Sequence, residues 1–311
     1  MNSLRTGTTE YLELRRSLGF RLEKDERLLR SFAGFMERRL AVYITAKLAV
    51  EWAQEPTSTD ANYRAGRLRA VRSFARHRIL EDPRTEIPSA ELLPRQRSTF
   101  RPYIFRQEEI DRILSTILKP HRGAKLISRW SRYAIFGLLS VTGMRVGEAL
   151  KLDLADVDLD QGVLTIRNTK FGKSRLVPLH ETTCAALKRY LEQRNAYLAG
   201  CAVKPFFISP LRLRIGHRTL DLSFMRLTRK LGMRGGTSNT GPRLHDLRHT
   251  MAVAALRQCY QMGANPERRL PALSTYLGHT HINYTYWYLH QNPALMTEAM
   301  VRLQHRWESP S

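Results

Sequence analysis

The sequence is poor in cysteine and has no long apolar run. Its three cysteines, Cys184, Cys201 and Cys259, form no CxxC pair. This usage argues against a disulfide framework or a cysteine-based zinc site and favours a reducing, cytoplasmic location. No apolar run approaches the roughly 18 residues that a membrane-spanning helix needs. The first ten residues also lack an apolar stretch, so we expect neither a membrane span nor a secretory signal.

Motifs for binding nucleotides or metals are missing as well. The chain has no glycine-rich Walker loop, which would cradle a nucleoside triphosphate. Aspartates occur around a predicted strand, but without metal-binding spacing, and we expect them to face solvent: Asp153, Asp156, Asp158 and Asp160. The sequence therefore contains no motif that predicts a nucleotide or metal site.

Acidic residues are too few to balance the basic ones. The chain has 28 Asp and Glu against 51 Lys and Arg, which leaves a formal net charge of +23. Arginine supplies 41 of those 51 residues, and its planar fork suits bidentate contacts with phosphate. The net charge is +6 before residue 100 and +17 after it, so both parts share the excess. A nucleic acid is the predicted partner, ahead of an anionic membrane surface.

The chain length indicates about two domains of roughly 100 to 200 residues. Apolar residues at helical spacing predict two helices between residues 9 and 39, interrupted near Gly19, and further helices over 44–53 and 61–77. Between residues 81 and 103 lie four prolines and four arginines, a composition that cannot continue a helix and predicts an extended basic linker. We therefore place a helical domain at 1–93, a linker at 94–104 and a second domain at 105–311.

The second domain is predicted to combine helices with a small sheet. Helices are expected after Arg106 and over 128–141, and again from Thr182 onward. Between them, β-favouring runs at 157–159, 163–168 and 175–179 are separated by short turns, which predicts a three-stranded antiparallel meander. The predicted fold class is mainly α with a small antiparallel sheet (α+β).

Four short segments of the second domain carry residues suited to phosphate chemistry. They are TGMRVGE at 142–148, the turn around Lys170, HDLRH at 245–249, and LGH at 277–279 followed by Tyr288. In this order the segments resemble the tyrosine recombinase, or phage integrase, family, which includes the Xer proteins. The resemblance covers roughly residues 99–293. The sequence at 270–288 looks more like recombinases of transposons and other mobile elements than like housekeeping Xer proteins.

The resemblance implies a site-specific recombinase that cuts and rejoins DNA through a 3′-phosphotyrosyl intermediate, without ATP or metal. Tyr288, nine positions after His279, matches the nucleophile. A tyrosine is mostly protonated at neutral pH, and His245 matches the general base that would take its proton. His279 matches a histidine that donates a hydrogen bond to the same phosphate.

The remaining residues of this site are basic. Arg145 and Arg248 match the pair that holds the non-bridging oxygens, where permanent charge stabilises the transition state. Lys170 matches the lysine that protonates the leaving 5′ oxygen, and Lys173 is the alternative, since a turn can deliver either. Glu148 is expected to pair with a neighbouring basic group or backbone donor and so hold the site together.

The expected partner is double-stranded DNA with specific recombination sites, bound by a homotetramer on synapsed DNA, with other recombinases of the same element as further partners. The helical domain at 1–93 looks like the core-binding domain of the family. Two alternatives remain: a type IB topoisomerase that relaxes supercoils as a monomer, and a DNA-binding protein without catalysis. A predicted amphipathic helix at 294–307 could cover its own core or dock on a neighbouring subunit. Tyr276 is expected to pack in the core, and His249 and His281 to support the site or contact DNA at most.

Overall fold

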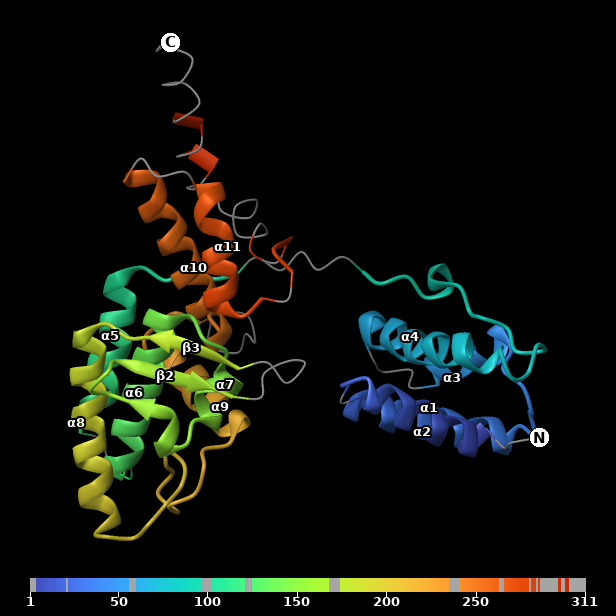
Figure 1. Ribbon diagram of the computed structural model, residues 1–311, viewed down its shortest axis with the longest axis horizontal. Coiled ribbons are helices and arrows are strands. Elements are labelled where there is room, and N and C mark those ends of the chain that lie inside the picture. Colours follow the sequence, from blue (N-terminus) through green and yellow to red (C-terminus); the bar gives the residue numbers. More distant parts are fainter. Residues whose placement is uncertain are drawn as a thin grey trace. The chain divides into compact units, whose positions relative to one another are not determined.

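A computed structural model gives the arrangement of the chain. The structure describes residues 4–20, 22–55, 60–96, 102–120, 123, 125–167, 174–234, 241–262, 266–279, 281–283, 285, 296–297 and 300–301. The chain divides into two compact units, Met1–Phe100 and Arg101–Ser311 (Figure 1). The division falls within the 94–104 segment that the sequence marks as a linker.

The described part of the first unit is helical. It contains α1 (Leu4–Ser17), α2 (Glu23–Arg38), α3 (Ala46–Gln54), α4 (Ala61–Arg78) and the short 3-10 helix η1 (Ala90–Leu92). The predicted interruption is confirmed, because Gly19, between α1 and α2, has a φ of 85° that favours glycine. The predicted helices at 44–53 and 61–77 are confirmed as α3 and α4. Asp60 caps α4, since its side chain accepts a hydrogen bond from the Asn62 amide at 3.1 Å.

Aromatic side chains form the centre of the first unit. Phe32, Trp52 and Phe74 are buried there, and the Phe32 and Trp52 rings meet edge to face with centroids 5.2 Å apart. Arg67 is buried beside them, with its guanidinium carbon 3.9 Å from the Trp52 ring centroid. It also donates a hydrogen bond to the Trp52 carbonyl at 2.7 Å. The cation–π contact and this bond offset the cost of burying its charge.

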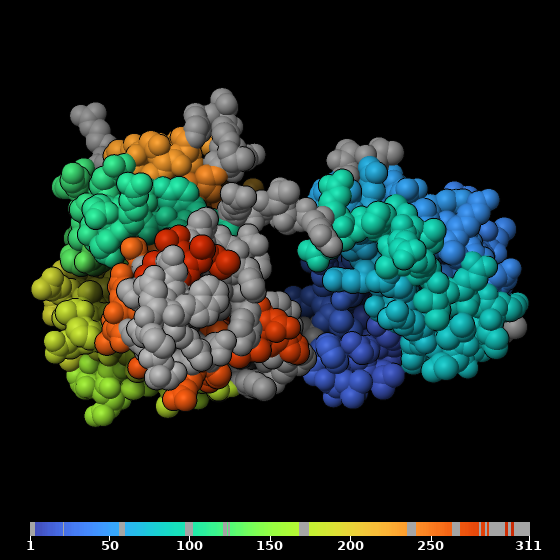
Figure 2. Space-filling model, turned by 90° about the horizontal axis from the view of Figure 1, so that it is seen from above, coloured from blue at the N-terminus to red at the C-terminus, as the bar shows by residue number. Residues whose placement is uncertain are grey.

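Helix α6 (Leu126–Thr142) forms the centre of the second unit. It packs against α5 (Gln107–Leu118), α8 (Glu181–Leu198) and α10 (Leu244–Gln261). The unit also contains α7 (Val146–Lys151), η2 (Leu154–Asp156), α9 (His217–Lys230) and α11 (Pro266–Leu277). The orange and red-orange segment of α10 and α11 reaches the surface of this unit (Figure 2). In the described part of the chain, none of the helices has the length and apolar character needed to cross a membrane.

The predicted antiparallel meander is confirmed. Strands β1 (Val157–Asp158), β2 (Val163–Ile166) and β3 (Arg175–Pro178) pair in the order β1-β2-β3, and Ile166 lies opposite Arg175. Alternate residues of β2 and β3 face the core, as period-two burial requires. The predicted fold class, mainly α with a small antiparallel sheet, is therefore confirmed. Lys170 and Lys173, in the connection from β2 to β3, lie outside the described residues.

The end of α6 depends on a glycine. Gly143 has a φ of 60°, and a Cβ there would lie 3.1 Å from Leu277 Cδ2 and 3.2 Å from Met251 Cε. The close fit lets α11 and α10 pack onto the end of α6.

Gly143→Ala is expected to destabilise the second unit by about 1 to 3 kcal/mol, because a left-handed alanine is strained and its methyl group overpacks this contact. Gly147→Ala is the control: apart from its chain neighbours and its own helix backbone, no atom lies within 4 Å of the place its methyl group would take. The residue is inside α7, so stability should hold or rise. Urea denaturation compares the two. An equal midpoint for Gly143→Ala and the wild type would contradict the packing argument.

Candidate active site

Arg145 lies immediately before α7 and is held by three contacts. Its backbone N–H donates to Glu148 Oε2 at 3.0 Å, and its Nη1 donates to Glu148 Oε1 at 2.9 Å. Its Nη2 donates to the Gly278 carbonyl at 2.8 Å, at the end of α11. The predicted pairing of Glu148 is thereby confirmed. The Arg145 side chain is 39% exposed, so a phosphate can reach it.

Arg248 lies in the second turn of α10 and is 3% exposed. Its Nη1 donates to the Gly143 carbonyl and its Nη2 to the Leu277 carbonyl, both at 2.8 Å. Arg248 and Arg145 therefore bind neighbouring carbonyls at the end of α11. The structure brings together the two arginines that the sequence predicted as a pair.

The histidines lie beside these arginines. His245 and His249 are one turn apart on α10, and their rings meet edge to face with centroids 4.8 Å apart. His279 follows α11, with its Nδ1 2.8 Å from the hydroxyl oxygen of the buried Thr285. That contact orients the ring and directs its Nε2 edge away from Thr285. His249, which the sequence placed at most in a supporting role, is buried against His245.

The pKa values of His245 and His279 are lowered because both rings are buried close to several arginines. Burial, together with the positive charges of Arg248, Arg243 and Arg145, lowers the pKa of His245 to about 4. Burial also lowers the pKa of His279 to about 4, together with the electrostatic effect of four neighbours, Arg248, Arg145, His245 and Arg175. Both rings are therefore neutral at pH 7. A neutral His245 can accept a proton, and a neutral His279 can donate an N–H.

His249 makes stability depend on pH in a defined direction. Burial, with the nearby His245 and Arg243, lowers its pKa from 6.5 to about 3. Between about pH 3 and pH 6.5 the unfolded chain binds more protons at His249 than the folded chain does. The contribution of the neutral His249 to folding stability is therefore full above pH 6.5 and falls as the pH drops. The slope is at most about 1.4 kcal/mol per pH unit for this residue.

His249→Asn should therefore make the urea midpoint less dependent on pH between about pH 7 and pH 5. The control is His217→Asn, since His217 lies on the exposed surface of α9. An identical pH profile for wild type and His249→Asn would contradict the burial of a neutral ring.

Two of the six predicted site residues, Lys170 and Tyr288, lie outside the described residues. So do Lys173 and the tyrosines at 284 and 286. Of the helix predicted at 294–307, residues 296–297 and 300–301 are described, and they are helical. The other four residues, Arg145, His245, Arg248 and His279, gather at one place.

A cavity of about 630 Å³ opens beside this cluster and is lined by Arg145 and His245. Further basic side chains line it, from Arg234, Arg243 and His217. Three arginines and one carboxylate, that of Asp221, line the cavity, and this excess of positive charge suits an anion.

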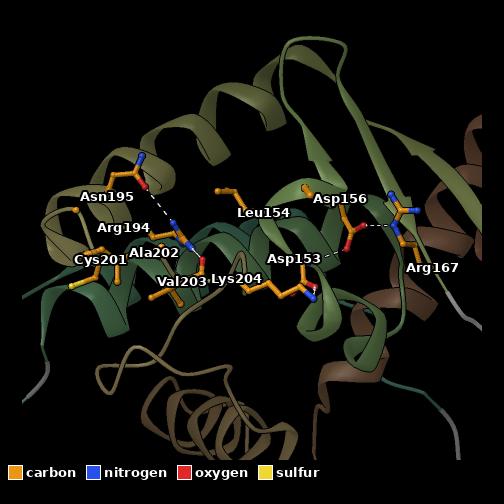
Figure 3. A pocket seen from close by; sticks show the side chains of 13 residues that line it. Asp153, Leu154, Asp156, Arg167, Arg194, Asn195, Cys201, Ala202, Val203 and Lys204 are labelled. Carbon is orange, nitrogen blue, oxygen red and sulfur yellow. Dashed lines mark hydrogen bonds and ion pairs between the residues drawn. The ribbon is translucent and has the colours of Figure 1, made fainter.

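A larger cavity, of about 1080 Å³, contains none of the predicted site residues (Figure 3). Arg194 in its wall donates to the carbonyls of Val203 and Pro205, at 2.6 and 2.9 Å. Across the cavity, Asp156 pairs with Arg167 at 2.5 Å. The expectation that the aspartates face solvent is wrong for Asp153 and Asp156, whose partly buried carboxylates form ion pairs. We place the site at the smaller cavity, because Arg145 and His245 line it.

The histidines of the cluster do not form a metal site. No group of three or more His, Cys, Asp or Glu side chains in the described part of the chain is arranged to hold an ion. The Nδ1 of His279 instead lies 2.8 Å from the Thr285 hydroxyl oxygen.

Sequence reasoning missed one residue of the cluster, Arg175. Its Nη1 and Nη2 donate to the two oxygens of Glu148 at 3.1 and 2.7 Å, and its Nε donates to the Tyr276 carbonyl at 3.1 Å. Alternation along β3 could have revealed it, because Arg175 shares a face with the buried Val177. An arginine on the core face of a strand needs a partner. Tyr276 packs in the core, as predicted.

Solved structures define the class of this fold. The chain resembles the Tn1549 transposon integrase in complex with transposon right end DNA, with a TM-score of 0.67 and 18% identity, over 98% of this chain and 99% of that one. It also resembles the XerH site-specific recombinase bound to a palindromic difH substrate, with a TM-score of 0.63 and 20% identity, over 91% and 78% of the two chains. The fold is that of the tyrosine recombinases.

Sequence relatives identify the family. The phage integrase family model matches residues 104–294. The chain is 49% identical over 311 residues to y4rB of Sinorhizobium fredii, an integrase/recombinase by name, covering 99% of both chains. It is 30% identical over 227 residues to the tyrosine recombinase XerD of Caulobacter vibrioides, covering 73% of this chain and 70% of XerD. The chain belongs to the phage integrase family and is a site-specific DNA recombinase.

Proposed function

We propose that this recombinase cuts and rejoins DNA strands through a 3′-phosphotyrosyl intermediate on Tyr288. The observation that carries the proposal is the convergence of Arg145, His245, Arg248 and His279 around the end of α11. Two arginines and two neutral histidines supply permanent charge, a proton acceptor and an N–H donor in one place. Tyr288 follows His279 by nine positions in the chain.

In this mechanism the Tyr288 oxygen attacks the scissile phosphorus and its proton passes to His245. The bond from phosphorus to the 5′ oxygen breaks, and Lys170 gives that oxygen a proton, with Lys173 as the alternative. The phosphate remains joined to Tyr288. A 5′ hydroxyl of another strand can then attack it, which reverses the step and requires neither ATP nor metal because the linkage is conserved.

The remaining groups stabilise the pentacoordinate transition state. Arg145 and Arg248 hold the non-bridging oxygens, whose negative charge grows as the tyrosine attacks. Both guanidiniums already bind carbonyls through one or two of their nitrogens, which fixes their orientation before DNA arrives. His279 donates from the ring edge opposite Thr285. Little reorganisation is then needed when the phosphate binds.

The partner in this proposal is double-stranded DNA carrying specific recombination sites. The net charge of +23 supports it, as does the DNA in the structures of the Tn1549 integrase and XerH. The domain at 1–93 acts as the core-binding domain, joined by the linker at 94–104 to the catalytic domain at 105–311. Four copies assemble on two synapsed sites in the cytoplasm, with other recombinases of the same element as further partners, and move or resolve a mobile element.

The test uses a plasmid with two copies of the DNA that flanks the gene, incubated with the full-length protein and EDTA without ATP. The proposal predicts recombined circles, which require the cognate sites. Relaxation of any supercoiled plasmid, with or without these sites, would instead indicate a topoisomerase. Site binding without strand cleavage would indicate a DNA-binding protein and contradict the proposal.

A further inference from the structure

Three arginines cap the end of α11. The last carbonyls of a helix have no partner within the helix. Here Tyr276 accepts from Arg175 Nε at 3.1 Å, and Leu277 accepts from Arg248 Nη2 at 2.8 Å. Gly278 accepts from Arg145 Nη2 at 2.8 Å. The three arginines come from β3, α10 and the start of α7, so the segment that leads into His279 is attached to three separate elements.

All three side-chain nitrogens of Arg175 donate to protein groups. Its Nη1 and Nη2 meet both oxygens of Glu148 in a bidentate pair, and its side chain is 13% exposed. Glu148 also accepts from the Arg145 side chain at 2.9 Å. Burial alone would raise the pKa of the Glu148 carboxyl, but its bonds to Arg175 and Arg145 outweigh burial and lower it. Glu148 is therefore an anion shared by two cations.

The shared carboxylate affects the charge that Arg145 can offer to a phosphate. With both arginines present, Glu148 leaves one net positive charge in the group of three. Without Arg175, the carboxylate would neutralise Arg145 alone, and the field at the phosphate would weaken.

Gly278 places Arg175 directly against the backbone before His279. Its φ is 68°, and a Cβ at this position would lie 2.8 Å from Arg175 Nη1 and 2.9 Å from Arg175 Cζ. The guanidinium therefore occupies the space that any other side chain would need. The same peptide supplies the carbonyl that Arg145 binds.

We propose that Arg175 is a positioning residue for strand cleavage, because it holds both Glu148 and the end of α11. Through Glu148 it preserves the charge and orientation that Arg145 offers to the phosphate, and through the end of α11 it keeps His279 in place. This inference rests on the proposed function of the same site. Arg175 does not contact the substrate, and it acts through Arg145 and the backbone at 276–278. Arg175 also joins Glu148, Arg145 and the end of α11 to β3, the strand that follows the connection containing Lys170.

Arg175→Lys and Arg175→Gln in the full-length protein test the proposal. Lysine keeps the charge but cannot form the bidentate pair, and glutamine keeps a short polar side chain. At saturating DNA, we expect the single-turnover cleavage of a nicked suicide substrate to slow about 100-fold for both variants, since misplaced transition-state contacts cost rate rather than ground-state affinity. DNA affinity should change less than about 3-fold.

Arg167→Lys is the matched control, because Arg167 directly follows the neighbouring strand β2 and also pairs with a carboxylate, that of Asp156. It should cleave at the wild-type rate. Urea denaturation of each variant checks that it is folded at the assay temperature, and wild-type cleavage by both Arg175 variants overturns the proposal whatever their stability.

A substrate with a bridging 5′ sulfur at the scissile bond separates positioning of the arginine from delivery of the proton. Sulfur leaves without a proton donor, so Lys170→Ala should regain activity on it while the Arg175 variants should not. Recovery of Arg175→Lys on the sulfur substrate would overturn the proposal, because it would place the defect at the leaving group. Absence of cleavage by the wild-type protein would count against the proposed function, whereas wild-type rates in both Arg175 variants would remove this inference alone.

Discussion

Tyr288→Phe should abolish strand cleavage, with a loss of at least about 10⁴-fold in rate and no covalent adduct. The change removes one oxygen, and that oxygen is the proposed nucleophile, so no other group can replace it in the bond to phosphorus. DNA affinity should stay within about 2-fold of the wild type, because phosphate contacts from the basic surface supply most of the binding.

The control for this prediction is Tyr276→Phe. Tyr276 lies on α11, packs in the core, and has a pKa raised by burial, so it should remain protonated. Removing its hydroxyl should leave the adduct intact. Tyr284→Phe and Tyr286→Phe extend the comparison to the other tyrosines near position 288. If the adduct persists in Tyr288→Phe and disappears in one of these, the nucleophile is assigned to the wrong residue.

Arg248→Lys should lower the cleavage rate by about 10³-fold at saturating DNA, the scale seen when one preorganised donor to a developing oxyanion is lost. The guanidinium of Arg248 donates to two carbonyls, and in the proposed mechanism it also holds a phosphate oxygen. A lysine has a single nitrogen and cannot do both, so either the end of α11 or the phosphate loses its partner.

Arg257→Lys serves as the control, since Arg257 is an exposed arginine further along α10. Its cleavage rate should stay within about 2-fold of the wild type, because exposed charges away from the site contribute little. A wild-type rate for Arg248→Lys, measured under single turnover with the suicide substrate, would show that the fork geometry is unnecessary and would contradict the assigned role.

Much of the fold could be predicted because its signals are local. Helical spacing of apolar residues marks α1 to α6, and Gly19 marks the break between the first two. Strand alternation and short turns mark the meander. The positions of Arg145, His245, Arg248 and His279 followed from motif order, and the structure gathers them at one place.

The contacts that hold the site could not be predicted, because they join residues far apart in the chain. Arg145 and Gly278 are separated by 133 positions, and their hydrogen bond exists only once α11 has packed against the ends of α6 and α7. The same reason explains why Asp153 and Asp156 were expected to face solvent. Their partners, among them Arg214 and Arg167, lie in later segments that the fold brings alongside.

The most direct test of the account is to trap the DNA adduct and identify the linked residue. The full-length protein is incubated with a nicked suicide substrate from the DNA flanking its gene, digested with protease, and the DNA-linked peptide is sequenced by mass spectrometry. The account predicts a single linkage from the Tyr288 oxygen to a 3′ phosphate, with release of a 5′ hydroxyl in the presence of EDTA. A linkage to another residue, a linkage to a 5′ phosphate, or cleavage that leaves no protein on the DNA would contradict it.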